Sequence, residues 1–267
     1  MTNLPSLMSL KGRRALITGG AGHIAVAMAE TLAELGASLI LVDRDVDRLT
    51  SLATDLDRTW HVPVTSLVCD LESERDRNRI IDAVFTDELG LDILVNNAAF
   101  VGTTSLEGWA VPFEDQTLDT WRRAFEINLT AVFHLSKAFL PLLRASGHGS
   151  IVNIGSIYGE YGPDWSLYQG TTMANPAAYG VSKGGLFQLT RWLATTIAPQ
   201  VRVNAISPGG VARGQPDSFV QRYTSRTPLQ RMASEDDFRG AIAYLSSDLS
   251  AFVTGQVLAV DGGWGVW

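Results

Sequence analysis

The stretch Ala15-Leu16-Ile17-Thr18-Gly19-Gly20-Ala21-Gly22 begins a pattern that the rest of the chain repeats. It reads as a buried strand that runs into a glycine-rich turn. Apolar residues at helical spacing follow over 24–35, and Gly36 ends that helix. A second apolar run over 37–42 leads directly to Asp43. A strand, a glycine turn, a helix, a second strand and an acid in this order are typical of a dinucleotide-binding site.

Each part of this arrangement has a physical reason. Glycines let the backbone approach a pyrophosphate, and the helix that follows supplies free N–H groups and the positive end of its dipole. The carboxylate of Asp43 can accept both ribose hydroxyls of adenosine and would repel a 2′-phosphate, which favours NAD over NADP. Arg44 weakens that preference, because an arginine there could bind a phosphate. A plain tight turn is the alternative, and Asp43 argues against it.

Strands and helices continue to alternate to the end of the chain. We expect further strands at 64–69, 91–95, 150–154, 201–206 and 257–260, and helices at 72–88, 117–145, 176–197 and 234–246. Such alternation predicts an α/β fold, a doubly wound sheet of seven parallel strands with helices on both faces. We expect one domain over 1–267. Ligands of such sheets bind beyond the carboxyl ends of the strands.

Composition narrows the possible functions. The chain has 267 residues and a net charge of −7, which argues against a nucleic-acid or anionic membrane partner. The single cysteine, Cys69, excludes an internal disulfide and a multi-cysteine metal site, and its apolar neighbours indicate a buried thiol. We expect no metal. The first ten residues lack a basic segment followed by an apolar one, so we expect a cytoplasmic protein.

The pair Tyr179 and Lys183 is the strongest candidate for chemistry. Residues four apart share one face of a helix. A phenol has an unperturbed pKa of about 10, and a neighbouring ammonium favours the phenolate and lowers that pKa. The pair could therefore exchange a proton with a carbonyl or alcohol oxygen. Taken alone, the pattern is common and fits a surface tyrosine near an unrelated lysine.

Taken together, these motifs resemble the short-chain dehydrogenase/reductase family over nearly the whole chain, from Leu10 to the C-terminus. The matching pieces are Thr18-Gly19, Asp43, Asp70, Asn96-Asn97-Ala98, Asn128, Ser156, Tyr179 with Lys183, Pro208-Gly209 and Thr254-Gly255. The resemblance implies a Rossmann-type domain, an NAD(P)-dependent oxidoreductase that acts on CH–OH groups, and a homotetramer built on the helices around Asn128 and Tyr179.

The resemblance also implies catalytic roles. Tyr179 would be the general acid/base, and Lys183 would lower its pKa and bind the nicotinamide ribose. Ser156 would orient the substrate oxygen. Asn128 would interrupt its helix and hold a water that relays protons. Ser156 could instead cap a strand end and Asn128 could be a surface amide, but an unpaired amide on the apolar face around Asn128 would be costly.

A larger set of residues would bind the cofactor. These are Gly19, Gly22, His23, Ile24, Asp43, Arg44, Asp70, Leu71, Asn97, Ala98, Ala99, Tyr179, Lys183, Pro208, Gly209 and Val211. Asp70 could also be a helix N-cap. Three positions depart from the family pattern. His23 replaces a glycine beside the pyrophosphate, Ala99 replaces another glycine, and Arg213 stands where the family often has a threonine.

Two loops are candidates for the substrate, 157–176 and 211–232. Ser156 and Tyr179 lie 23 residues apart, further than in most of the family. The inserted segment 160–173 is rich in aromatic and hydroxyl side chains, which suits a sugar or polyol. A subunit contact or a lid is an equally open alternative. Over 168–179 the sequence also resembles enzymes of bacterial surface-sugar and flagellin-glycan biosynthesis.

The second loop predicts a mobile lid over 215–226. Arg213, Arg222 and Arg226 could meet an anionic group of the substrate, although a solvated helix face is the simpler interpretation for Arg222 and Arg226. Trp264 and Trp267 follow a glycine pair near the C-terminus. Exposed tryptophans would form an unusual apolar patch, so we expect both at a subunit interface.

The leading hypothesis is an NAD-dependent oxidoreductase of a secondary alcohol or ketone of a sugar or polyol. One alternative is an NADPH-dependent reductase of 3-oxoacyl carriers, which Asp43 and the insertion disfavour. Another is a dinucleotide-binding regulatory protein without turnover. The complete set of catalytic candidates disfavours the regulatory protein, and His23 leaves it open.

Overall fold

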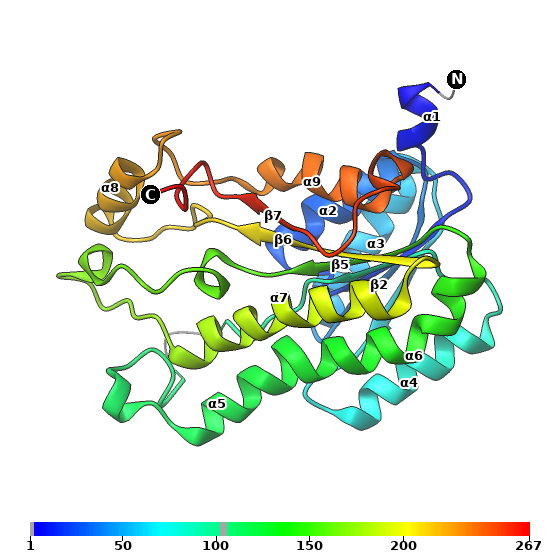
Figure 1. Cartoon of the computed structure of the whole chain (residues 1–267). Helices are drawn as coiled ribbons and strands as arrows, with labels where there is room; N and C mark the ends of the chain where they lie inside the picture. The colour runs from blue at the N-terminus through cyan, green and yellow to red at the C-terminus, as the bar shows by residue number, and fades with distance from the viewer. Residues whose placement is uncertain (1–2, 102–105) are drawn as a thin grey trace.

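The computed structural model describes residues 3–101 and 106–267 and contains one seven-stranded, all-parallel sheet (Figure 1). The strand order is β3-β2-β1-β4-β5-β6-β7, as the expected doubly wound fold requires. The strands are β1 Arg14–Thr18, β2 Ser38–Asp43, β3 Val64–Val68, β4 Ile93–Asn96, β5 Gly149–Ile154, β6 Val201–Pro208 and β7 Val257–Val260. All seven fall where the sequence predicts strands.

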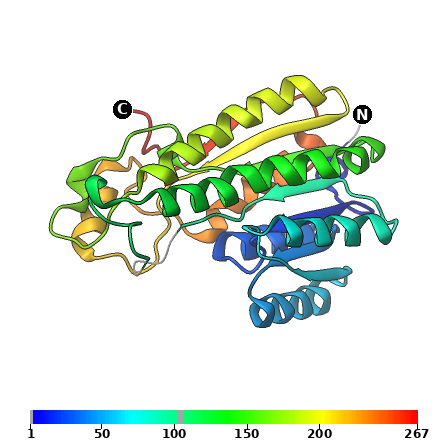
Figure 2. The ribbon, with the colours of Figure 1, turned by 90° about the horizontal axis from the view of Figure 1, so that it is seen from below.

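Helices cover both faces of the sheet. They are α1 Leu4–Met8, α2 His23–Glu34, α3 Val46–Trp60, α4 Glu74–Thr86, α5 Leu118–Phe125, α6 Ala131–Ala145, α7 Ala177–Ile197, α8 Asp217–Arg226 and α9 Arg239–Ser246. In Figure 1, α2 and α9 lie above the sheet, whereas α4, α6 and α7 lie below it. Figure 2 shows α6 and α7 side by side along the lower face.

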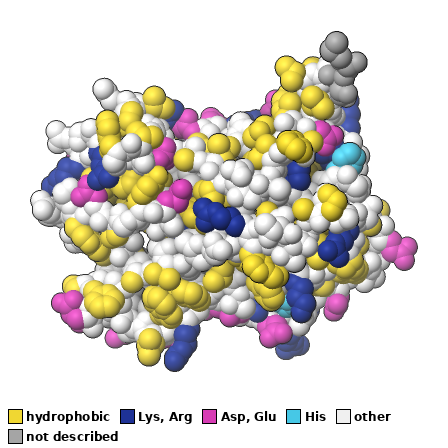
Figure 3. All heavy atoms as spheres, in the orientation of Figure 1, with side chains coloured by type: hydrophobic (Ala, Val, Ile, Leu, Met, Phe, Trp, Pro, Cys, Tyr) yellow, Lys and Arg dark blue, Asp and Glu magenta, His cyan; other side chains and the backbone are white. Residues whose placement is uncertain are grey.

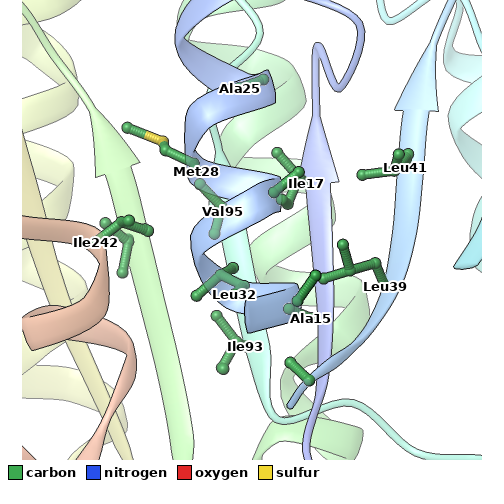
Figure 4. Close-up of a cluster of buried hydrophobic side chains, with 14 of the residues drawn as sticks. Ala15, Ile17, Ala25, Met28, Leu32, Leu39, Leu41, Ile93, Val95 and Ile242 are labelled. Atoms are coloured by element: carbon green, nitrogen blue, oxygen red, sulfur yellow. The ribbon is translucent and has the colours of Figure 1, made fainter. Parts of the chain in front are cut away.

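Strand β1 shows why both faces need cover. All five of its residues are buried, with Ala15 and Ile17 on one side and Leu16 on the other. On the first side, Met28 and Leu32 of α2 pack against these strand residues (Figure 4). Alternate side chains of β1 therefore belong to two separate hydrophobic cores, one on each face of the sheet, as expected for a central parallel strand.

No helix was predicted from the sequence between β2 and β3, where the structure has α3. Its start is set by Asp45, whose carboxylate accepts a hydrogen bond from the Arg48 N–H at 3.1 Å. Leu49, Ala53 and Leu56 form its buried stripe at helical spacing. The signal was present in the sequence, but most of the helix is polar and exposed.

The long helix expected over 117–145 is divided by one turn of π-helix, η2, which spans Glu126–Thr130. The Ala131 N–H reaches back to the Glu126 carbonyl, five residues away. Asn128 lies within this turn and is fully buried. The local interruption expected at Asn128 is therefore confirmed. Within the described residues, no helix is both long and apolar enough to cross a membrane.

The expectation that Trp264 lies at a subunit interface is wrong. Its side chain is 1% exposed and packs inside the chain against Tyr223, with ring centroids 6.0 Å apart. The guanidinium of Arg226 covers its ring at 4.3 Å. Trp264 thus belongs to a small core beneath α8, whereas Trp267 is exposed and its predicted interface role stays a prediction.

The surface carries no sign of a broad cationic region on the face seen in Figure 3. Lysine and arginine side chains are scattered there among acidic and apolar ones. This distribution agrees with the negative net charge and with the expectation of a small-molecule ligand. Cys69 is buried, as predicted.

Candidate active site

A cavity of about 600 Å³ lies at the carboxyl edge of the sheet. Every residue predicted to bind the cofactor lines it, together with Ser156. Of the predicted catalytic residues only Asn128 is absent from its wall. The sequence therefore predicted the composition of this site, because the ends of parallel strands meet at one edge.

The glycine turn after β1 is pressed against the end of β4. Gly19 has a φ of +64°, and a Cβ there would lie 2.8 Å from the Ala98 Cα. The Asn97 side-chain amide donates to the carbonyls of Thr18 and Gly19, both at 3.1 Å. The Thr18 hydroxyl accepts the N–H groups of Asn97 and Ala98. Only glycine fits at position 19 without displacing the contact between this turn and the end of β4.

Asp43 fixes the other side of the turn. One carboxylate oxygen accepts the Ala21 N–H at 3.0 Å, and the second accepts the N–H groups of Arg44 and Asp45 at 2.7 and 3.1 Å. A carboxylate has about four acceptor positions. Asp43 is therefore held rigidly at the cavity with acceptor capacity left for a ligand hydroxyl.

Helix α2 begins at this turn with Gly22 as its N-cap, and no side chain among the described residues caps it. Its first N–H groups and the positive end of its dipole remain available for an anion. His23 is exposed at the first helical position and lines the cavity. The histidine is thus part of the cavity wall beside the start of α2.

Asp70 and Leu71, after β3, line the cavity, and their predicted contact with the adenine ring stays a prediction. Asp70 does not cap α4, since Ser73 does so by accepting the Asp76 N–H. The buried Arg77 donates to the Leu71 carbonyl and forms an ion pair of 2.7 Å with Glu126. This arginine fixes the loop that carries Leu71 to the π-helical turn.

Small residues bring helix α7 close to the end of β5. A Cβ on Gly159 would lie 2.7 Å from the Lys183 backbone, and one on Gly180 would lie 3.0 Å from the Tyr158 carbonyl. The short helix η3, Ile157–Gly159, therefore packs directly on α7. This close approach places Ser156, the N-cap of η3, in the same cavity wall as Tyr179.

Lys183 is 2% exposed and donates from Nζ to the Ile154 carbonyl at 2.7 Å. Burial lowers its pKa to about 8. Burial raises the pKa of Tyr179, while the hydrogen bond with Ser156 and the charge of Arg213 act in the opposite direction. The predicted lowering by Lys183 is not seen, because that ammonium is directed at Ile154 and lies 5.9 Å from the centre of the Tyr179 ring.

Asn128 reaches the site through other residues. Its Oδ1 accepts the Phe100 N–H at 2.6 Å, and its Nδ2 donates to the Ser182 hydroxyl at 2.9 Å. That hydroxyl donates in turn to the Tyr179 carbonyl. The alternative of a surface amide is therefore wrong, and the side chain joins η2 to the helix that carries the tyrosine. Its predicted part in a proton relay stays a prediction.

The two predicted substrate loops differ in their relation to the cavity. Residues 157–176 are all described and none lines it, whereas Val211, Arg213 and Gln215 of the second loop do. The insertion packs instead against α8: Arg222 donates to two of its carbonyls, and Arg226 pairs with Asp164 at 2.5 Å. The solvated face expected for Arg222 and Arg226 is therefore wrong.

Several wall residues were not predicted from the sequence. They include Phe100, Val101, Leu106, Arg123 and Ile127. Phe100 and Val101 continue directly from Asn97-Ala98-Ala99, so their position after β4 was a readable signal. Arg123 carried no such signal, because it reaches the wall from α5. It forms a bidentate ion pair with Glu72. Residues 102–105 lie outside the described chain.

Comparisons with known proteins agree with this geometry. A family model described as "Enoyl-(Acyl carrier protein) reductase" matches residues 19–265. The chain is 29% identical to post-translational flagellin modification protein A of Campylobacter coli, over 96% of this chain and 100% of that protein. The structure of NAD⁺-bound xylitol dehydrogenase has a TM-score of 0.84 at 32% identity, with 95% and 99% of the two chains covered.

A gluconate 5-dehydrogenase from Burkholderia cenocepacia J2315, in complex with NADP and tartrate, has a TM-score of 0.86 at 29% identity. The alignment covers 99% of this chain and 100% of that one. The chain belongs to the short-chain dehydrogenase/reductase family. It is an oxidoreductase that uses a nicotinamide cofactor in alcohol and ketone chemistry.

The residues present fit such a cofactor. The turn at Gly19 leaves no room for a side chain, α2 begins without a side-chain cap, and Asp43 faces the same cavity. These features match an elongated ligand with a central diphosphate. Among the described residues no group of three or more His, Cys, Asp or Glu could bind a metal.

The turn at Gly19 gives a direct test of the cofactor site. We expect Gly19→Ala to weaken NADH binding at least tenfold, because the Cβ would meet Ala98 and the residue would keep a positive φ. Titration of NADH fluorescence measures the dissociation constant. Gly240→Ala, at a helical position with open space around it, is the matched control. Equal affinities for both variants would contradict the assignment.

Proposed function

We propose that the protein transfers a hydride between NAD and a secondary alcohol or ketone of a sugar or polyol. The observation that carries this proposal is the single cavity that brings the cofactor residues to Ser156, Tyr179 and Lys183. When bound, the nicotinamide would accept or supply the hydride. The proton donor Tyr179, the hydrogen-bond donor Ser156 and the nicotinamide would then all lie around one reacting carbon.

Three side chains would carry out the proton transfer, the hydrogen bonding to the substrate oxygen and the binding of the ribose. During reduction the Tyr179 hydroxyl gives a proton to the carbonyl oxygen as that oxygen gains charge, and the Ser156 hydroxyl donates a hydrogen bond to the same oxygen. During oxidation Tyr179 takes the alcohol proton. Lys183 is positioned one turn further along α7 to bind the ribose nearest the reaction.

Asp43 supports NAD as the preferred cofactor. Its carboxylate is rigid, faces the cavity and would repel the 2′-phosphate of NADP. Arg44, exposed beside it, is the one feature that favours NADP. The two related structures named above carry NAD⁺ and NADP respectively, so the test must be made on this chain.

Polyol and sugar-acid dehydrogenases among the relatives support a carbohydrate substrate. The similarity to a flagellin-modification protein agrees with the resemblance found over 168–179. An acyl carrier substrate is the second candidate, because the matched family model is described by that activity. The second candidate would suit NADPH and a cavity open to a long thioester, and Asp43 disfavours it.

We also propose a homotetramer formed through α6 and α7. Phe133, Val181 and Trp192 on these helices are each about half exposed, at 47%, 51% and 55%. Figure 3 shows apolar side chains gathered along the lower edge, where α5 to α7 lie. Apolar surface on a pair of long helices is typical of subunit interfaces.

Replacing the proposed acid tests the chemistry. We expect Tyr179→Phe to lower kcat roughly a thousandfold, the range of general acid–base catalysis, and to leave NADH binding within a few fold. The assay follows NADH absorbance over a panel of sugars and polyols. Tyr158→Phe is the control, because its hydroxyl pairs with Tyr168 and does not line the cavity. Unchanged turnover in Tyr179→Phe would refute the catalytic proposal.

Removing the acid at β2 tests the cofactor. We expect Asp43→Ala to raise the ratio of kcat/KM for NADP over NAD by ten- to a hundredfold, since the repulsion of the 2′-phosphate is lost. The ratio cancels any general damage to the turn. Asp45→Ala, at the exposed N-cap of α3, should leave the ratio unchanged. A wild-type enzyme that strongly prefers NADP would overturn the assignment.

Light scattering tests the assembly. We expect a particle of four times the 28.9 kDa chain mass. Val181→Arg should lower that mass, because a charge would enter an apolar contact. Val46→Arg on α3 is matched in exposure, at 51%, and should stay tetrameric. A wild-type monomer, or equal masses for both variants, would contradict the proposed interface.

A further inference from the structure

Arg213, Arg222 and Arg226 lie in the second loop and α8, and the structure separates these three into two groups. Arg222 donates to the carbonyls of Leu167 and Gln169, and Arg226 pairs with Asp164. Both therefore bind the insertion to α8 and are not directed at the cavity. Arg213 alone of the three lines the cavity, together with Ser156 and Tyr179.

The backbone around Arg213 is fixed on both sides. The Arg213 N–H donates to the Gln215 side-chain oxygen at 2.7 Å, and the Gln215 amide donates to the Val211 carbonyl at 2.7 Å. The neighbouring Ala212 N–H donates to the Ala233 carbonyl at 2.9 Å. The guanidinium is thus carried by a loop whose backbone is held in place by hydrogen bonds.

The guanidinium has most of its hydrogen-bonding capacity to spare. Its Nε contacts Glu235 at 3.3 Å, with both side chains more than a third exposed, so this is a weak surface pair. Among the described residues neither of its two terminal nitrogens has a hydrogen-bond partner. Those two nitrogens form the planar fork that matches a carboxylate or a phosphate.

The charges around Arg213, at the β6 end of the cavity, favour an anionic ligand. The acidic wall residues lie at the opposite flank of the sheet, where Asp43 ends β2 with Arg44 beside it and Asp70 follows β3. Lys183 donates to the Ile154 carbonyl, and the proposed function assigns its remaining donors to the cofactor ribose. The charge of Arg213 also reaches the reaction centre, since it acts to lower the pKa of Tyr179.

We propose that Arg213 binds an anionic oxygen group of the substrate, a carboxylate or a phosphate, so that the enzyme prefers acidic or phosphorylated sugars to neutral polyols. This inference rests on the proposed function, which supplies the alcohol or ketone chemistry at Tyr179. It adds the class of substrate.

Three probes with one carbon skeleton test the inference: glucitol, gluconate and glucitol 6-phosphate. We expect wild-type kcat/KM with NAD to be at least tenfold higher for one of the two anions than for glucitol. Arg213→Met should reduce that ratio to near one, and Arg213→Lys should restore part of it. Using the ratio at one pH cancels any change in Tyr179 that affects all three probes.

Two controls separate the possible sources of an effect. Glu235→Gln removes the competing carboxylate, so the anion ratio should stay or rise. NADH titration of Arg213→Met reports whether the guanidinium serves the diphosphate of the cofactor. Weaker NADH binding with an unchanged anion ratio would overturn the inference.

Equal use of the neutral and anionic probes would also overturn the inference and leave the proposed function standing. Absence of NAD-linked turnover over the whole panel of alcohols and ketones would refute both.

Discussion

A lysine ammonium buried to 2% exposure is the constraint on which the active site depends. A buried charge is costly unless it is hydrogen-bonded, and Lys183 meets this demand by donating to the carbonyl of Ile154, the last residue of β5. The bond requires α7 to lie against the end of that strand. The glycines at 159 and 180 make the approach sterically possible. Tyr179 and Ser156 are brought together as a consequence.

Much of the fold and of this site could be predicted from the sequence, because chain order alone determines where parallel strands end. Asp43, Asn97, Ser156 and Pro208 each follow or finish an apolar run, so their meeting at one edge required no knowledge of side-chain contacts. Tyr179 was assigned through its spacing to Lys183. The spacing could not reveal that the lysine would be directed at a strand carbonyl and not at the phenol.

Contacts between distant segments set the limit of prediction. Arg226 looked like part of a solvated helix face, yet it pairs with Asp164 and covers Trp264. Neither partner can be inferred from local spacing, because each is brought there by a different loop. Once these contacts form, the insertion and α8 are joined, and Tyr161 and Tyr168, two of the aromatic residues that suggested a sugar site, pack against Trp264 and Phe219. Composition identified an unusual segment but not the surface that it would contact.

The same contacts explain how substrate preference can be separated from the reaction. Arg222 and Arg226 join α8 to the insertion. The part of the second loop that lines the cavity is the short stretch carrying Val211, Arg213 and Gln215. Changes there would alter charge beside Tyr179 without disturbing Lys183 and its carbonyl partner. The β2 and β3 flank of the cavity then carries Asp43 and Asp70 with Arg44 beside them, and Arg213 adds a guanidinium beyond β6. A ligand would be oriented by this polarity before any chemistry begins.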